Sequence, residues 1–356
     1  MKRYLALMLI IILTISLTGC KSSNTKEKFN TLGDEEISTG EILTIADYFP
    51  FKENRIMDYE GIGNEYAERR TFIEFVEGNK AQIKIMNPGT VFVKVVEYKD
   101  GEMAEIFSEG EFYHIENMLN SSSNTKDILL KEPLEVGNLW STKDGHKRSI
   151  TSLNQRIETP LGIYEALEVT TEFDESKIKD YYVKDIGLVA SIFSFEDGIE
   201  IKTLLKSIEN KEQEMEIISF YPTAKDIGTA YVVQSIEFGT NDSIEDIIES
   251  VLKNPPTNKL LSPISSDTKI NKIHLNRSSW TLEADFSKEL LEEMNAGSTF
   301  ETEILKSIVN TLGKFYDVDK VYLTIEGTPY ESGHYGIRIG EYFKVDTGNI
   351  EEFKER

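Results

Sequence analysis

The four histidines are the first side chains to consider as metal ligands or as general acids and bases. They are His114, His146, His274 and His334, and they lie far apart in the sequence. The chain contains no H-E-x-x-H, G-x-S-x-G, P-loop or EF-hand pattern. A metal site would therefore need the fold to bring distant segments together. His146 follows Asp-Gly, a turn dipeptide, and is expected at an exposed hairpin turn.

Carboxylates are so numerous, at 62 Asp and Glu residues, that close pairs occur by chance. Glycosidase chemistry needs two carboxylates at a defined separation, one of them with a raised pKa, and no sequence context singles out such a pair. Gly61-Ile62-Gly63 lacks the third glycine and the strand-to-helix context of a phosphate-binding loop, so it indicates a turn. We therefore predict no catalytic residue, no bound cofactor and no metal site, that is, a protein that is not an enzyme.

Cys20, the only cysteine, lies in a context that predicts a covalent modification. Two basic residues precede an apolar run from residue 4 to residue 17, and the run closes on L-T-G-C. Its length is that of a signal peptide and falls short of the roughly 20 residues of a membrane-spanning helix. The pattern resembles a bacterial lipoprotein signal peptide over residues 1–20, which implies that Cys20 becomes the N-terminus and carries a diacylglycerol. A secretory signal with an incidental cysteine is the alternative.

The charge of the chain limits its partners. The formal net charge is −23, and removal of Lys2 and Arg3 with the signal would take it to −25. Such a surface repels phosphate backbones and anionic headgroups, so we predict no nucleic-acid partner and an attachment to the membrane through the lipid alone. With Cys20 lipidated, the chain has no disulfide and no thiol nucleophile.

Residues 21–40 are polar and lack a periodic apolar pattern, which predicts a flexible tether. Residues 45–209 then alternate apolar and polar side chains between Gly-containing turns, which predicts an antiparallel meander. A sheet of this length with almost no helix beside it must curl or fold over. We predict a curved antiparallel sheet or half-barrel. Residues 133–140 and 181–189 are similar to segments of exported β-rich lipoprotein domains of unassigned function.

A charged stretch at residues 209–216 predicts a boundary, and residues 215–346 follow a different pattern. Strands are expected at residues 216–221, 231–238, 269–275, 280–286 and 321–325. Two amphipathic helices lie between them, each with capping-box spacing at its start, Asp242 with Glu245 and Ser298 with Glu301, and the second is expected to stop at Gly313. The order ββαββαβ favours a two-layer α+β domain. Residues 347–356 are left as a C-terminal tail.

Several segments of this second domain, in the same order, resemble the GerM (GerMN) domain family of sporulation and spore germination proteins. They are S-F-Y-P at residues 219–222, residues 244–257, L-S-P-I at 261–264, A-D-F-S-K-E-L at 284–290, S-I-V-N-T-L at 307–312 and V-Y-L-T-I-E-G at 321–327. The resemblance implies a small module similar to ring-building domains of secretion systems. Asp285, Ser287 and Asn310 are typical of the family, and a structural role is expected for each.

Two functions remain open. In the first, the lipid holds the chain on the outer face of the cell membrane, and the chain is an assembly or protein-binding factor with a partner in the cell envelope or the sporulation apparatus. In the second, the curved sheet encloses an apolar ligand, and the chain is a carrier or sensor. A cavity of about 300 Å³ or more would favour the second function. Its lining would include Phe92, Phe107, Phe112 and Trp140.

Overall fold

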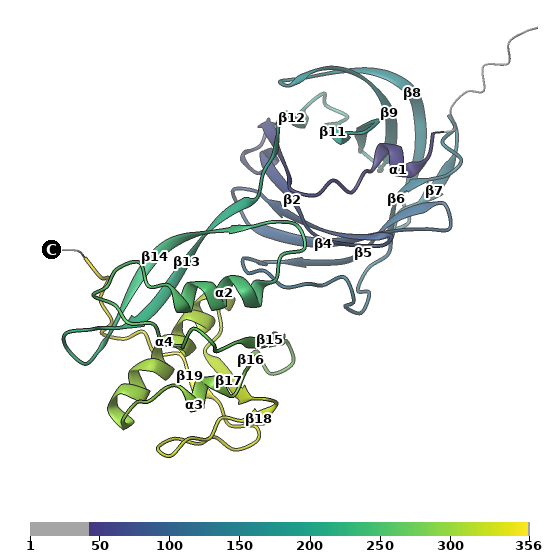
Figure 1. The fold of residues 1–356 in the computed structure, drawn as a ribbon. Helices are drawn as coiled ribbons and strands as arrows, with labels where there is room; N and C mark the ends of the chain where they lie inside the picture. The colour runs from purple at the N-terminus through teal and green to yellow at the C-terminus, as the bar shows by residue number, and fades with distance from the viewer. Residues whose placement is uncertain (1–42, 355–356) are drawn as a thin grey trace, which may run out of the picture. The chain divides into compact units, whose positions relative to one another are not determined.

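Twelve antiparallel strands follow one another around a strongly curved sheet (Figure 1). The computed structural model describes residues 43–354. The strand order is β6-β5-β4-β3-β2-β1-β12-β11-β10-β9-β8-β7, so neighbours in sequence are almost always neighbours in space. The bounds are β1 Arg55–Ile62, β2 Arg69–Glu77, β3 Lys80–Met86, β4 Val91–Lys99, β5 Glu102–Gly110, β6 Asp127–Lys131, β7 Leu139–Ser141, β8 Lys147–Thr159, β9 Gly162–Glu172, β10 Ser176–Val183, β11 Gly187–Phe195 and β12 Glu200–Asn210.

Side chains bridge the two edge strands, β6 and β7, where no ladder of backbone hydrogen bonds joins them. The Trp140 indole nitrogen and the Arg148 guanidinium both donate to the Ile128 carbonyl, at 2.9 and 2.6 Å. The Asn138 amide donates to the Lys131 carbonyl at 2.9 Å. These side chains connect the two edges of the sheet, which is therefore nearly closed. The predicted curved sheet or half-barrel is confirmed.

The short helix α1 (Ile45–Tyr48) lies against the concave face of the sheet (Figure 1). Ile45 packs there in one apolar cluster with Trp140, Leu167 and Tyr182. Each such side chain contributes roughly 1.5–3 kcal/mol when fully buried. This part of the concave face is therefore packed with side chains.

The convex face of strands β2 to β5 is also apolar, and the second part of the chain covers it. Phe72, Phe75, Val93 and Val95 belong to the same cluster as the core of that second part. The Phe75 ring meets the Phe238 ring edge-on at 5.6 Å. These strands are therefore buried on both faces, and several of their polar side chains, such as Glu74 and Lys84, are buried as well.

The second part contains the predicted order ββαββαβ, with the short elements α3, β18 and β19 in addition, and is confirmed as α+β. A hairpin, β13–β14, stands beside a sheet of order β15-β16-β17-β18, with β19 on β17. β16 and β17 are parallel, and α4 lies in the crossover that a parallel pair requires. The bounds are β13 Gln213–Pro222, β14 Thr229–Phe238, α2 Ile244–Lys253, β15 Ile270–Asn276, β16 Thr281–Phe286, α3 Glu289–Glu292, α4 Ser298–Tyr316, β17 Lys320–Ile325, β18 Thr328–Pro329 and β19 Phe343–Lys344.

The predicted cap of the first amphipathic helix was wrong by one residue. Ser243 is the N-cap of α2 and accepts from the Asp246 amide at 3.2 Å. The Asp242 carboxylate instead accepts from the Gly239 amide at 2.7 Å. Glu245 turns away to accept from the Ile273 amide of β15 at 3.1 Å. A neighbouring strand therefore takes the carboxylate that the capping box would have used.

The ends of the second helix, α4, also differ from the prediction. Gly297 is its N-cap, and Glu301 is buried and accepts from the Tyr330 hydroxyl at 2.7 Å. The helix continues through Gly313 to Tyr316, and Asp317 takes the left-handed conformation at its end. A Cβ on Gly313 would lie 2.1 Å from a Val345 methyl. Gly313 thus permits close packing inside the helix, where the sequence suggested a stop.

Gly61 belongs to strand β1, so the predicted turn begins later, at Gly63, whose φ is +85°. A Cβ on Gly61 would lie 2.1 Å from the backbone nitrogen of Glu68, next to the 3-10 helix η1 (Glu65–Ala67). Gly61 is therefore required by a close approach of two backbone segments.

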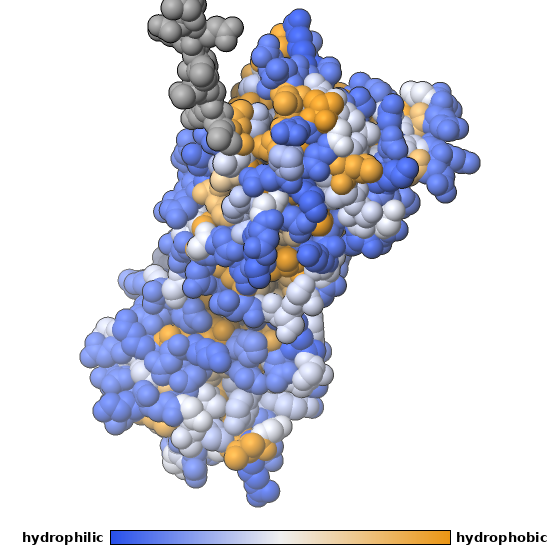
Figure 2. Space-filling view, turned by 90° about the vertical axis from the view of Figure 1, so that its right-hand side faces the viewer, coloured by the Kyte–Doolittle hydropathy of each residue, from blue (hydrophilic) through white to orange (hydrophobic). Residues whose placement is uncertain are grey.

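The surface seen in Figure 2 is mostly hydrophilic, with apolar residues gathered mainly in its upper part. Cys20, the predicted signal of residues 1–20 and the tether of residues 21–40 lie outside the described residues. Between residues 43 and 354, no helix is long and apolar enough to cross a membrane. The residues from Leu43 onward cluster into one unit, and the domain limits at 45–209, 215–346 and 347–356 stay predictions.

Candidate functional site

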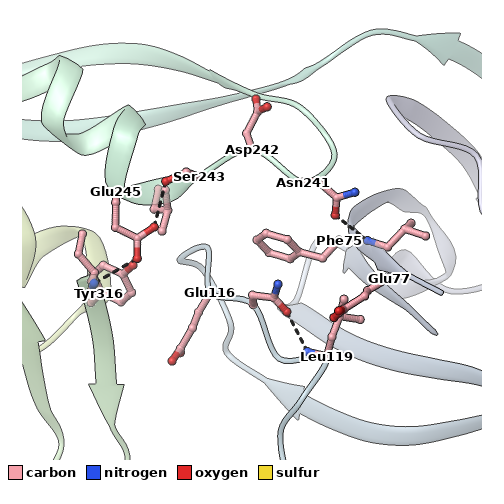
Figure 3. Close-up of a pocket in the computed structure, with 13 residues that line it drawn as sticks. Phe75, Glu77, Glu116, Leu119, Asn241, Asp242, Ser243, Glu245 and Tyr316 are labelled. Carbon is pink, nitrogen blue, oxygen red and sulfur yellow. Dashed lines mark hydrogen bonds between the residues drawn. The ribbon is translucent and has the colours of Figure 1, made fainter. Parts of the chain in front are cut away.

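A cleft of about 450 Å³ opens where the curved sheet meets the α+β part. The end of β2, residues 116–119, the start of α2, β15 and α4 all contribute to its walls (Figure 3). Four carboxylates line it, from Glu77, Glu116, Asp242 and Glu245. We call it the junction cleft.

Hydrogen bonds to the backbone hold most polar side chains of the junction cleft (Figure 3). Asn241 accepts from the Val76 amide at 2.8 Å, and Asn117 accepts from the Leu119 amide at 3.0 Å. Glu245 also accepts from the Ser243 hydroxyl at 3.1 Å. These side chains bond to groups of the turns and of the helix start that form the walls of the cleft. Their first role is therefore to fix the junction.

Glu116 is the most buried of the four carboxylates, and three cationic or titratable side chains surround it. The Arg277 guanidinium lies 2.9 Å away in an ion pair, and His114 and His274 each lie 3.5 Å away. Burial alone raises the pKa of Glu116, but His114 and Arg277 outweigh it and leave the pKa below its usual value. Glu116 is thus held as a carboxylate at neutral pH.

This arrangement suits binding and positioning better than proton transfer. A general acid needs a pKa near the working pH, and the pKa of Glu116 moves the other way. Burial, and then the charges of Glu116 and Glu245, hold the pKa of the Tyr316 phenol well above its usual value. The Tyr316 hydroxyl donates to the Ile115 carbonyl at 3.1 Å. The cluster therefore links the α+β part to the segment before β6.

A buried ion pair beneath this segment keeps it in place. Lys84 and Glu74, both almost fully buried, lie 2.7 Å apart on β3 and β2. Lys84 also donates to the His114 carbonyl at 2.7 Å. Gln82 donates to the Glu116 carbonyl at 2.8 Å and accepts from the Met118 amide at 2.6 Å. Sequence reasoning missed these residues because polar side chains that alternate with Ile83 and Ile85 look like the solvated face of a strand.

The histidines converge only in part. His114 and His274 meet at Glu116, although the sequence separates them widely. His146 follows the hairpin turn and packs against the Phe173 ring at 4.5 Å, so it is less exposed than predicted. His334 is exposed on a loop after β18. In the part of the chain that the structure describes, no three His, Cys, Asp or Glu side chains are grouped to hold a metal ion.

Three of the four aromatic residues expected around an apolar ligand lie in two different apolar clusters. Phe107 and Phe112 belong to the cluster that extends into the α+β part, whereas Trp140 belongs to the cluster on the concave face. Phe112 stacks on His114 with ring centroids 4.2 Å apart. These side chains therefore serve two separate cores.

The family comparison covers the α+β part. Residues 219–331 match the family model Germane, described as sporulation and spore germination. The match confirms the predicted resemblance over these residues, which we call the Germane domain after the matching model. Among curated proteins, none matches the chain.

Three solved structures are similar to parts of the chain. The first GerMN domain of the sporulation protein GerM from Bacillus subtilis is 22% identical, with 36% of this chain and 97% of that chain covered and a TM-score of 0.28. The tandem GerMN domains of the same protein are 21% identical, covering 35% and 45%, at 0.28. A putative lipoprotein from Clostridium perfringens is 18% identical, covering 37% and 87%, at 0.24.

The three family-typical residues of the Germane domain make structural hydrogen bonds. The Asp285 carboxylate accepts from the Thr324 hydroxyl at 2.6 Å, the Gly327 amide at 2.7 Å and the Asn271 amide at 2.9 Å. The Ser287 hydroxyl accepts from the Lys269 amide at 2.9 Å. Asn310 holds Asp346 through two hydrogen bonds. Each side chain joins two segments that are distant in sequence.

We expect Asp285 to make stability depend on pH. Burial raises its pKa, but the bonds from Thr324, Asn271 and Gly327 outweigh this and leave the pKa below the usual value of about 4. A group with a lowered pKa in the folded state stabilises the protein above that pH and loses this contribution as the pH falls. Urea unfolding at pH 7 and at pH 3 should therefore show a larger deficit for Asp285→Asn at pH 7. An equal deficit at both pH values would contradict this.

Proposed function

We propose that the chain is a membrane-anchored extracytoplasmic lipoprotein that acts as a non-enzymatic assembly or protein-binding factor in sporulation or spore germination. The observation that carries the proposal is the Germane domain of residues 219–331. The L-T-G-C pattern that ends at Cys20 supports the membrane anchor. In the junction cleft, the depressed pKa of Glu116 and the structural bonds of its neighbours favour binding over acid–base chemistry.

Loss of the lipid should release the protein from the membrane. In Cys20→Ala, the acyl chains cannot be attached, and the acidic surface offers no electrostatic attraction to anionic lipids. We expect labelling with a fatty-acid probe to be abolished and the protein to move to the soluble or secreted fraction. A Ser22→Ala variant, two residues away, serves as the matched control. Cys20→Ala protein that stays with membranes after a high-salt wash would contradict the anchor.

The role in sporulation has a separate test. We expect deletion of residues 216–346 from the chromosomal copy to lower the yield of heat-resistant spores or the rate of germination in a sporulating host. A variant with Lys314→Leu, an exposed position on α4, should behave like the wild type. Normal spores that germinate normally from the deletion strain would refute this part of the proposal.

A further inference from the structure

The end of the chain pairs with an edge of the Germane domain. The Tyr231 amide donates to the Glu351 carbonyl at 3.2 Å, and the Phe353 amide donates to the Tyr231 carbonyl at 2.8 Å. The pairing is parallel and places Glu352 beside Tyr231 of β14. Residues 350–354 thus run beside β14 and are joined to it by one parallel bridge, and we call them the strap.

The strap also fills an apolar site. Phe353 packs against a small cluster formed by Tyr221, Ala230, Val232 and Leu260. A cavity of about 640 Å³ lies between the strap and the start of β14. One aromatic side chain and two backbone hydrogen bonds thus hold the strap, against the entropy lost when a chain segment is ordered. The strap is therefore weakly held compared with the strands beneath it.

The rest of this edge of β14 is open to a partner. The amide and the carbonyl of Tyr231 both point away from β13. Backbone groups of every second residue in a strand point to the same side, so those of Val233, Ser235 and Glu237 also point away from β13. All three residues are exposed. An exposed strand edge is a template for an additional strand. The strap covers only the beginning of it.

The exposed face of the hairpin is acidic. Glu214 lies opposite Glu237, and Glu216 lies opposite Ser235, with the side chains exposed. Within residues 43–354, no ion pair shorter than 4 Å involves these three glutamates. A segment that pairs with β14 in the same parallel direction and extends past the position of Phe353 would run toward these glutamates. Basic side chains in such a strand would meet opposite charge.

We propose that the β14 edge is a docking site for an extended segment of a partner protein. This segment carries an aromatic side chain that takes the place of Phe353, followed by basic residues that face the glutamates of the hairpin. The strap occupies the site until such a segment displaces it. The inference rests on the proposed function in that it names the binding surface and the chemistry of the partner.

The test uses the chain from residue 21 onward, without the lipidated cysteine, in two forms: one that ends at residue 356 and one that lacks residues 350–356. The probe is a fluorescent peptide with the sequence of residues 348–356. In a second, neutral peptide, glutamine replaces the two basic residues after Phe353, at positions 354 and 356, which alternate with Phe353 and therefore fall on the face of the hairpin glutamates. We expect saturable binding to the shortened chain, about tenfold or more weaker binding to the full-length chain, and weaker binding of the neutral peptide. A peptide with Phe353→Ala should lose about tenfold or more in affinity.

A full-length Phe353→Ala chain provides the same test without truncation and should bind the peptide more tightly than the wild type does. In both the shortened chain and the Phe353→Ala chain, Glu237→Gln should weaken binding of the native peptide more than binding of the neutral peptide. Absence of saturable binding to both altered chains, or equal binding to altered and wild-type chains, would overturn the proposal. So would dimers that form by exchange of the strap between two copies, detected by light scattering. None of these results depends on the spore phenotype, so the proposed function can fail separately.

Discussion

Lys84→Met should lower the free energy of unfolding by about 3–5 kcal/mol, the usual cost of leaving one member of a buried ion pair without its partner. Lys84 and Glu74 lie 2.7 Å apart and are almost fully buried. The variant would leave the Glu74 carboxylate in a site closed to water. It would also remove the bond from Lys84 to the His114 carbonyl, which holds the segment next to the junction cleft. Urea unfolding followed by circular dichroism measures the change.

The double variant Glu74→Gln with Lys84→Met separates the lone charge from the loss of packing. A glutamine at position 74 is neutral and can still accept from Gln82, which now donates to Glu74 at 2.8 Å. We expect the double variant to recover a large part of the lost stability. Lys202→Met, which breaks an exposed ion pair with Glu200, should change stability by less than about 1 kcal/mol. A double variant less stable than Lys84→Met would contradict the explanation.

The alternation of side chains predicted the strands and the curvature of the sheet, but not which core each face would join. Phe107 and Phe112 look, in the sequence, like lining residues of a closed sheet. In the structure they face the α+β part, because the convex face of β2 to β5 is also covered. Gln82 and Lys84 of β3 lie buried on that convex face, so polar side chains there do not mark a solvent-exposed outside. The sequence pattern therefore does not determine which core each apolar side chain joins.

The junction itself could not be predicted, because its side chains come from segments far apart in the chain. Arg277 reaches Glu109 at 3.1 Å and Glu116 at 2.9 Å across a sequence distance that no local pattern spans. His274 approaches the same glutamate from β15. Spacing rules detect ligands on one helix or hairpin, whereas tertiary packing alone forms this cluster.

The helix limits show the same division between local and tertiary effects. Apolar spacing located both helices of the Germane domain, and Ser243 and Asp242 compete for the same cap. Glu301 has the right spacing for a capping box, yet the hydroxyls of Tyr330 and Ser332 hold it in the core. Capping preferences are worth about 1 kcal/mol, which two hydrogen bonds to a buried carboxylate exceed. Tertiary contacts therefore set the final limits.

Asn310 connects these considerations to the C-terminal segment. It is fully buried in α4, donates to the Asp346 carbonyl at 2.7 Å and accepts from the Asp346 amide at 2.9 Å. Leucine has a similar volume and no polar atoms, so Asn310→Leu would leave both backbone groups of Asp346 without a partner. We expect the free energy of unfolding to fall by about 2–4 kcal/mol. The Germane domain should still fold, because the core residues of α4 are unchanged.

The same variant should loosen the strap, since Asp346 is the last firmly held point before residues 350–354. Hydrogen exchange should therefore show faster exchange of the Phe353 amide in Asn310→Leu, while amides in β16 and β17 keep most of their protection. Lys314→Leu, on the exposed side of the same helix, should change the free energy of unfolding by less than about 0.5 kcal/mol and leave exchange of the Phe353 amide unchanged. If Asn310→Leu left stability and the Phe353 amide unchanged, the hydrogen bonds to Asp346 would not hold the C-terminal segment.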